Sequence, residues 1–134
     1  MGVRGLLTCA VVPEAPCVHA DEWLIDIANV EVAPLTSSEV VGALCDEVIA
    51  AFRLTLVAAP MVHRFPGAAG ITALYLLSES HLAIHTWPER RGALLSLGTC
   101  RPGVPESFSW SDVVCRHLGA HADVVVRRVE RSIA

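Results

Sequence analysis

The most informative absence in this sequence of 134 residues is lysine, because all ten basic side chains are arginine. Without lysine the chain cannot form a lysine Schiff base, cannot attach pyridoxal phosphate and cannot contain a P-loop. We therefore expect that any amine chemistry here uses an electrophile from another source.

Other absences narrow the class further. The five cysteines (Cys9, Cys17, Cys45, Cys100 and Cys115) are odd in number and include no CxxC pair, which indicates neither a disulfide framework nor a zinc knuckle. No basic cluster is longer than a pair such as Arg127-Arg128 and the net charge is −4, so we expect no nucleic-acid partner.

Long apolar runs are also missing, although the mean hydropathy is +0.51. No run reaches the roughly 18 apolar residues that span a membrane, and the apolar opening of the chain is brief for a secretory signal. We expect a cytoplasmic protein with no membrane partner.

What is present indicates one α+β domain. Hydrophobic residues make up 53% of the chain and charged residues 18%, enough for one buried core. The patterns predict strands at 22–30, 54–63, 71–77, 81–87, 92–100 and 122–130, and helices at 35–52 and 109–118. Thr36 and Glu39 fit a capping box for the first helix, and Gly119 would follow the second. We expect a two-layer sandwich, a mostly antiparallel sheet with both helices on one face, over residues 21–134, after an N-terminal extension of residues 1–20.

The segment SESHLAIHTWPE, residues 78–89, concentrates reactive side chains beside an apolar strand. His81 and His85 would be about 13 Å apart on a strand, too far to share one metal ion. A Ser-His-acid hydrolase lacks its G-x-S-x-G turn here. On chemistry alone these are also ordinary polar residues at a strand boundary, and we expect no metal.

The longer string LSESHLAIHTWPE, with GTC ending at Cys100, resembles the processing site of the bacterial and archaeal S-adenosylmethionine decarboxylases. Weaker similarity in HRF (63–65) and EWLID (22–26) extends the resemblance over about residues 22–130. It implies a protein that makes its own electrophile: the chain would be cut between Glu79 and Ser80, and Ser80 would become an N-terminal pyruvoyl group. That group would capture the substrate amine as a Schiff base and accept electrons when CO₂ leaves. The fragments would be a β-chain of residues 1–79 and an α-chain of 80–134.

The resemblance also implies roles for matching positions. His85 would assist self-cleavage, Cys100 would return a proton to the substrate, and Thr72 would help processing. Phe65 and Trp87 would hold adenine, Glu89 would bind the ribose hydroxyls, and Asp26 would face the sulfonium charge. Because Ser80 and His85 are five residues apart, they point to opposite faces of an ideal strand. We therefore expect a bulge, bend or strand start at Ser80.

Three functions remain open at this point. S-adenosylmethionine decarboxylation, which supplies the aminopropyl donor for spermidine synthesis, is the first. A pyruvoyl-dependent ornithine or arginine decarboxylase is the second, because Arg90-Arg91 replaces the family's usual aromatic residue and would attract a carboxylate. A catalytically silent, partner-binding homologue is the third. In each case the uncovered face of the sheet predicts a homodimer or a larger assembly.

Overall fold

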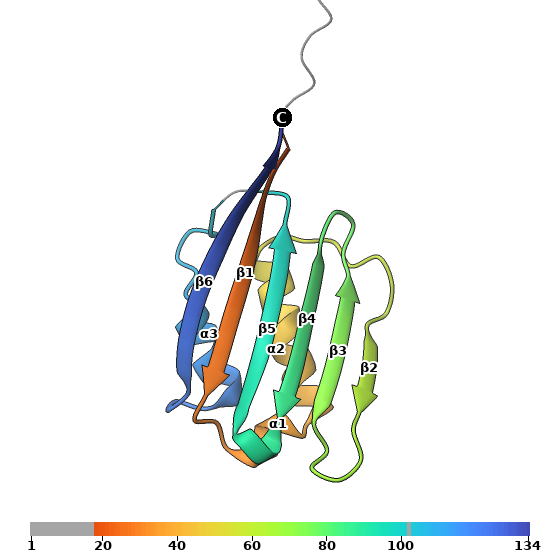
Figure 1. The fold of residues 1–134 in the computed structure, drawn as a ribbon, viewed down its shortest axis with the longest axis vertical. Helices are drawn as coiled ribbons and strands as arrows, with labels where there is room; N and C mark the ends of the chain where they lie inside the picture. The colour runs from red at the N-terminus through yellow and green to blue at the C-terminus, as the bar shows by residue number, and fades with distance from the viewer. Residues whose placement is uncertain (1–17, 102) are drawn as a thin grey trace, which may run out of the picture.

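Six antiparallel strands form one sheet in the structure, a computed structural model that describes residues 18–101 and 103–134 (Figure 1). The strands are β1 (Val18–Ala28), β2 (Met61–Arg64), β3 (Ile71–Leu76), β4 (His81–Trp87), β5 (Gly92–Thr99) and β6 (Asp123–Ile133). Their order across the sheet is β2-β3-β4-β5-β1-β6, and every neighbouring pair is antiparallel. The predicted α+β class is confirmed.

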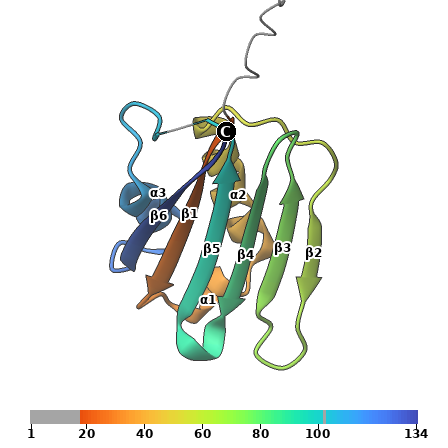
Figure 2. The same ribbon diagram turned by 45° about the horizontal axis from the view of Figure 1, so that its top comes forward.

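The helices α1 (Val32–Leu35), α2 (Ser38–Ala51) and α3 (Trp110–Leu118) lie on the same side of the sheet (Figure 2). A short 3-10 helix, η1 (Pro88–Arg90), joins β4 to β5. Both predicted helices exist, but the first begins later than expected. Ser37, not Thr36, caps α2: its Oγ accepts a hydrogen bond from the backbone N–H of Val40 at 3.2 Å. The Thr36 hydroxyl instead donates to the carbonyl of Ala33 at 3.1 Å and closes α1.

The predicted strand at 54–63 is wrong over most of its length. Only Met61–Arg64 forms β2, and Leu56 makes an isolated bridge to Leu77. Pro60 lacks the N–H that a ladder needs, which separates the two pieces. At the other boundary, β1 begins at Val18, inside the range expected to be an extension. The rest of that range, with Cys9 and Cys17, lies outside the described residues.

Alternation along the strands divides the sheet into two faces. In β4, Leu82, Ile84 and Thr86 are buried under the helices, whereas His85 and Trp87 lie on the opposite face. The helix-covered core also contains an aromatic cluster whose ring centroids lie 5.0–6.4 Å apart, made of Trp23, Phe52, Phe108 and Trp110. The core therefore lies entirely on one side, which leaves the other side for a site or a partner.

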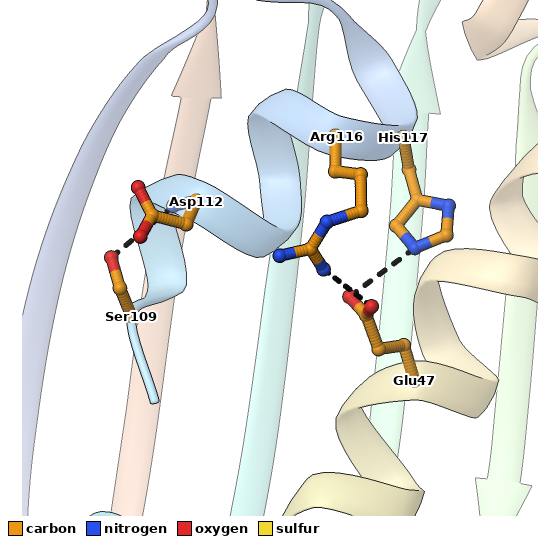
Figure 3. A network of polar contacts seen from close by, with 5 residues as sticks. All are labelled: Glu47, Ser109, Asp112, Arg116 and His117. Carbon is orange, nitrogen blue, oxygen red and sulfur yellow. Dashed lines mark hydrogen bonds and ion pairs between the residues drawn. The ribbon is translucent and has the colours of Figure 1, made fainter. Parts of the chain in front are cut away.

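The two longer helices are joined by one acidic side chain. Glu47 of α2 forms an ion pair with Arg116 of α3, and its carboxylate also lies 3.3 Å from Nε2 of His117 (Figure 3). The network orients the helix layer on the core face and lies away from the uncovered face described next.

The uncovered face of the sheet, called the bare face below, is strongly apolar. The strand registers place on it Met61, Leu74, Leu76, Trp87, Leu94, Val125, Val129 and Ile133, each at least 39% exposed. Two ion pairs, Asp26 with Arg127 and Glu22 with Arg131, lie among them. Among the described residues, no helix is long and apolar enough to cross a membrane.

Candidate functional site

Thr72 and His85 form a polar pair on the bare face. They are direct partners in the β3–β4 ladder, and the hydroxyl oxygen of Thr72 lies 2.9 Å from Nδ1 of His85. The His85 ring also packs at 5.9 Å against the ring of Trp87, two residues further along β4. These contacts fix the imidazole plane and leave Nε2 as the nitrogen available for proton transfer.

A pocket of about 260 Å³ opens beside this pair. Its walls come from the β2–β3 loop, from β3 and β4 and from η1, and consist of Phe65, Pro66, Ala68, Gly70, Thr72, His85, Thr86, Trp87 and Glu89. Gly70 allows the loop to pack closely, because a Cβ there would lie 2.6 Å from the carbonyl oxygen of Thr86. The pocket thus presents two aromatic faces and one carboxylate, which suits a planar ring attached to a group with hydroxyls.

Glu79 and Ser80 lie at the opposite end of β4, in the turn that joins it to β3. Leu77 and Ser80 exchange backbone hydrogen bonds of 3.1 and 3.4 Å, so Ser78 and Glu79 form the two-residue tip. β4 itself begins only at His81. The expected irregularity at Ser80 is therefore a strand start. Because Ser80 precedes β4, the alternation of β4 side chains between the two faces does not fix the direction of its side chain.

Cys100 contacts the same turn. Its Sγ lies 2.8 Å from the carbonyl oxygen of Glu79, with the thiol as donor. That carbonyl belongs to the peptide bond between Glu79 and Ser80. An exposed residue just past the end of β5 thus contacts the bond that the sequence predicts to be cut.

The predicted site residues fall into two groups, and the single chain does not bring these groups together. Five residues of extended chain separate Ser80 from His85, a distance of about 16 Å. The group at the turn, named the serine cluster below, consists of Glu79, Ser80 and Cys100. The group around the pocket, named the histidine cluster, consists of Phe65, Thr72, His85, Trp87 and Glu89. Each cluster lies at its own end of β4.

Asp26 lies nearer to the histidine cluster. It pairs with Leu94 in the β1–β5 register, and Leu94 pairs with His85, so Asp26 lies two strands away from the imidazole, about 10 Å. Its carboxylate is occupied by Arg127. Asp26 therefore already has a cationic partner in this structure, which weakens its expected role opposite a sulfonium.

His63 is a residue near the pocket that the sequence did not predict. His63 lies opposite Thr72 in the β2–β3 ladder and packs edge-on at 4.7 Å against Phe65, which supports one wall of the pocket. Its only signal was the HRF string.

Arg91 forms an ion pair with Glu31 at 2.9 Å and donates to the carbonyl of Val30, so only Arg90 of the arginine pair lies near Trp87. Within the described residues, no three His, Cys, Asp or Glu side chains gather as a metal site.

The fold is a two-layer α+β sandwich, an antiparallel sheet with helices on one face. Its site residues form polar clusters at both ends of the central strand β4. The model of the family described as S-adenosylmethionine decarboxylase matches residues 21–132. The chain belongs to this family. It also resembles a solved structure, the adenosylmethionine decarboxylase from Aquifex aeolicus VF5, with a TM-score of 0.63 and 24% identity over 82% of this chain and 89% of that one.

Similar curated proteins include S-adenosylmethionine decarboxylase proenzymes from three organisms. The one from Archaeoglobus fulgidus is 32% identical over 77 residues, 58% of this chain and 67% of its own. Those from Moorella thermoacetica and Synechococcus sp. (strain WH7803) are 38% and 40% identical, over 53% and 43% of this chain and 54% and 41% of their own. The match to Synechococcus thus spans less than half of that relative.

Proposed function

We propose that this chain is a self-processing, pyruvoyl-dependent decarboxylase of S-adenosylmethionine. The observation that carries the proposal is the contact of the Cys100 thiol with the carbonyl of Glu79, in the turn immediately before Ser80. Supporting it, the similar curated proteins are named proenzymes of this activity. The product would be the aminopropyl donor for spermidine synthesis.

Processing would begin at the Glu79–Ser80 bond. The hydroxyl of Ser80 attacks the carbonyl carbon of Glu79, the C–N bond breaks, and Glu79 is left as an ester on Ser80. A hydrogen bond from Cys100 would stabilise the negative charge that the carbonyl oxygen develops during this attack. Removal of the Cα proton of Ser80 by His85 then expels the Glu79 carboxylate. The remaining enamine takes up water and releases ammonia, which leaves the pyruvoyl group.

The group formed from Ser80 supplies the electron sink for decarboxylation. The turn suits it, because the Glu79–Ser80 bond lies between the end of β3 at Leu76 and the start of β4 at His81, so a cut there leaves both strands intact. The chain's own residues would bind and orient the substrate: Phe65 and Trp87 stack on the adenine and Glu89 accepts from the ribose hydroxyls. Cys100 would return the proton to the substrate α-carbon. Neither a metal nor pyridoxal phosphate is part of this proposal.

The two clusters would meet across a homodimer. Two copies related by a two-fold axis, with their bare faces together and their β4 strands antiparallel, would place the serine cluster of one against the histidine cluster of the other. The exposed apolar side chains of the bare face favour this packing. The pocket of about 260 Å³ is also smaller than the roughly 300–1,000 Å³ of typical ligand sites, as expected for half of a site.

The alternatives receive less support. An ornithine or arginine decarboxylase was suggested by two arginines, but Arg91 is bound by Glu31 and faces away from the pocket residues. Glu89, Phe65 and Trp87 together match a nucleoside better than an amino acid side chain. A silent homologue would not require the Cys100 contact with the Glu79 carbonyl. We place the enzyme in the cytoplasm.

The test is the mass of the purified protein under denaturing conditions, beside a Ser80→Ala variant. We expect two fragments divided at Glu79–Ser80, the second blocked at its N-terminus by pyruvoyl, and an uncut variant. The cut protein should release CO₂ from S-adenosylmethionine and not from ornithine or arginine. A wild-type chain that stays intact at 14.3 kDa after long incubation would reject the proposal.

A further inference from the structure

The position of the Cys100 thiol needs an explanation, because Cys100 is exposed and follows the last residue of β5. The segment around it is held from both sides. Thr99, only 3% exposed, donates its hydroxyl to the carbonyl of Arg101 at 3.0 Å and so turns the chain at Cys100. Thr99 is also the ladder partner of Asp21 on β1.

Asp21 makes a second contact beyond Cys100. Its Oδ2 accepts a hydrogen bond of 2.8 Å from the backbone N–H of Gly103. Gly103 has φ +88°, a conformation that favours glycine, so the chain is turned back toward Asp21 at this residue. Asp21 thus holds the chain on both sides of Cys100, through the ladder at Thr99 and through its carboxylate at Gly103.

The carboxylate of Asp21 is itself fixed. The side chain is 2% exposed, and Nη2 of Arg128 lies 3.0 Å from the same Oδ2. Arg128 is held in turn over the ring of Trp23, at 5.5 Å from its centroid, and by Glu130 at 3.2 Å. The hydrogen bond with Asp21 is the largest cause that raises the pKa of Arg128, so this guanidinium stays charged.

Stability alone does not account for this arrangement. Only Asp21 of the pair is buried, because the Arg128 side chain is 34% exposed, and an ion pair open to solvent contributes little to stability. The hydrogen bond to Gly103, between residues 82 positions apart, is what joins the pair to the segment that carries Cys100.

We propose that Asp21 is the residue that positions the Cys100 thiol on the carbonyl of Glu79. It touches neither the bond to be cut nor the substrate pocket, so it is a positioning residue whose side chain acts through Gly103. The proposal rests on the proposed function, because it assigns the purpose of the thiol to self-cleavage at that bond.

The test compares Asp21→Asn, which keeps an acceptor oxygen and loses the charge, with Asp21→Ala, which loses both. Glu130→Gln is the matched control, because it removes the other carboxylate on Arg128 and leaves Asp21 in place. Each is made in the cleaving chain and in a Ser80→Ala chain. In the uncut background, hydrogen exchange of the Gly103 amide and the alkylation rate of Cys100, located by peptide mapping, report the local geometry directly. Thermal unfolding shows that each variant is folded.

For Asp21→Ala we expect exchange at Gly103 about tenfold faster or more and faster alkylation of Cys100, because a hydrogen bond to a charged acceptor is lost. Self-cleavage should slow by about tenfold or more, since a displaced catalytic group loses rate steeply. Asp21→Asn should fall between Asp21→Ala and wild type, and Glu130→Gln should match wild type.

Wild-type exchange and alkylation in a folded Asp21→Ala or Asp21→Asn protein would overturn the positioning role. If Asp21→Ala does not fold, Asp21→Asn decides the question with the same two measurements. If the wild-type chain itself never cleaves, the proposed function fails separately, because exchange at Gly103 and alkylation of Cys100 are read in the uncut protein.

Discussion

The hydroxyl oxygen of Thr72 lies 2.9 Å from Nδ1 of His85, across one rung of the β3–β4 ladder. The register fixes both Cα positions, so the pair depends on the fold of the hairpin and does not need a mobile loop. A histidine held in this way has a defined ring plane and one free nitrogen, as a proton-transfer residue requires.

Thr72→Val should therefore slow self-cleavage by about tenfold, which is less than the roughly 10²–10⁴-fold that a general acid–base group itself contributes, because His85 is still present. The side chain keeps its shape and loses the oxygen that orients His85. Thr72→Ser restores the hydroxyl and should cleave at nearly the wild-type rate. The measurement is the time course of fragment formation after purification of the freshly synthesised chain. Equal rates for the valine and serine variants would contradict a role for the hydroxyl.

Mixing two inactive variants tests whether the site is shared between copies. His85→Ala retains Ser80, and Ser80→Ala retains His85, so a mixed dimer would contain one complete pair across its interface. We expect the His85→Ala chain to be cut when the two chains are coexpressed and to be cut very slowly alone. Different affinity tags on the two chains identify the cut one by mass. If Ser80 and His85 act within one chain, coexpression will restore no cleavage.

The pocket predicts a separation between binding and chemistry. Glu89→Gln removes a charged acceptor for hydroxyls and should raise KM for S-adenosylmethionine by about tenfold, since a hydrogen bond to a charged group contributes about 1.5–3 kcal/mol. Cleavage of the proenzyme should be unchanged, because the proposed steps of self-cleavage use Ser80, Cys100 and His85 and give Glu89 no part. Glu31→Gln, which alters the exposed partner of Arg91 outside the pocket, is the control. An unchanged KM in Glu89→Gln would remove Glu89 from the binding site.

Thr86 predicts a large effect on stability. It is 4% exposed, its Oγ1 accepts from the backbone N–H of Ile71 at 2.8 Å, and it donates to the carbonyl of Leu35 at 2.7 Å. Thr86→Val leaves both backbone groups buried without a partner and should lower the free energy of unfolding by about 2–4 kcal/mol. Thr86→Ser keeps both hydrogen bonds and should cost less. Urea unfolding of the uncut Ser80→Ala background measures both, and a valine variant as stable as the serine one would contradict the assignment.

The buried Cys45 predicts how stability changes at alkaline pH. Burial, the largest cause, raises the pKa of this thiol from its ordinary 9.0 to about 12, against a smaller opposite effect of the hydrogen bond to Tyr75. Between these two values the unfolded chain loses the proton and the folded chain keeps it, so stability falls as the pH rises. The contribution is about 1.4 kcal/mol per pH unit once the unfolded thiol is fully ionised.

Urea unfolding at pH 8, 9, 10 and 10.5 under reducing conditions measures this decline. Burial also raises the pKa of Tyr75, which adds to the loss above its ordinary value of 10.0. Serine at position 45 does not titrate in this window, so Cys45→Ser should lose the contribution of the thiol and show a shallower decline, with the contribution of Tyr75 remaining. Equal slopes for wild type and Cys45→Ser would show that the thiol does not contribute.

Local patterns predicted much of the fold. The second helix was placed within one residue of α3, because its apolar spacing and Gly119 at its end are both local signals. The strand predicted at 54–63 failed because an apolar segment becomes a strand only where a neighbour pairs with it. Residues 54–60 have only the bridge at Leu56, and the sequence carries no signal for that.

The sequence predicts candidate residues for the site, and it does not predict how they are arranged. The string from Leu77 to Glu89 contains five of the candidate residues. The irregularity at Ser80 was predicted because Ser80 and His85, five residues apart, would point to opposite faces of an ideal strand. That the groups separate into two clusters depends on strand direction and on which face is covered. The contact of Asp21 with Gly103 crosses 82 positions, so no local spacing could reveal it.

The strand order has a last consequence for the cut protein. A cut after Glu79 assigns β1, β2 and β3 to one fragment and β4, β5 and β6 to the other, yet the order in the sheet is β2-β3-β4-β5-β1-β6. Three ladders, β3–β4, β5–β1 and β1–β6, therefore join different polypeptides. Both fragments contribute strands to the same sheet and are hydrogen-bonded to each other along these three ladders. Cutting would therefore convert one chain into a tightly held heterodimer without changing its fold. Once denatured, the two separated fragments could refold only by a bimolecular association. The mature form therefore depends on folding of the intact chain before it is cut.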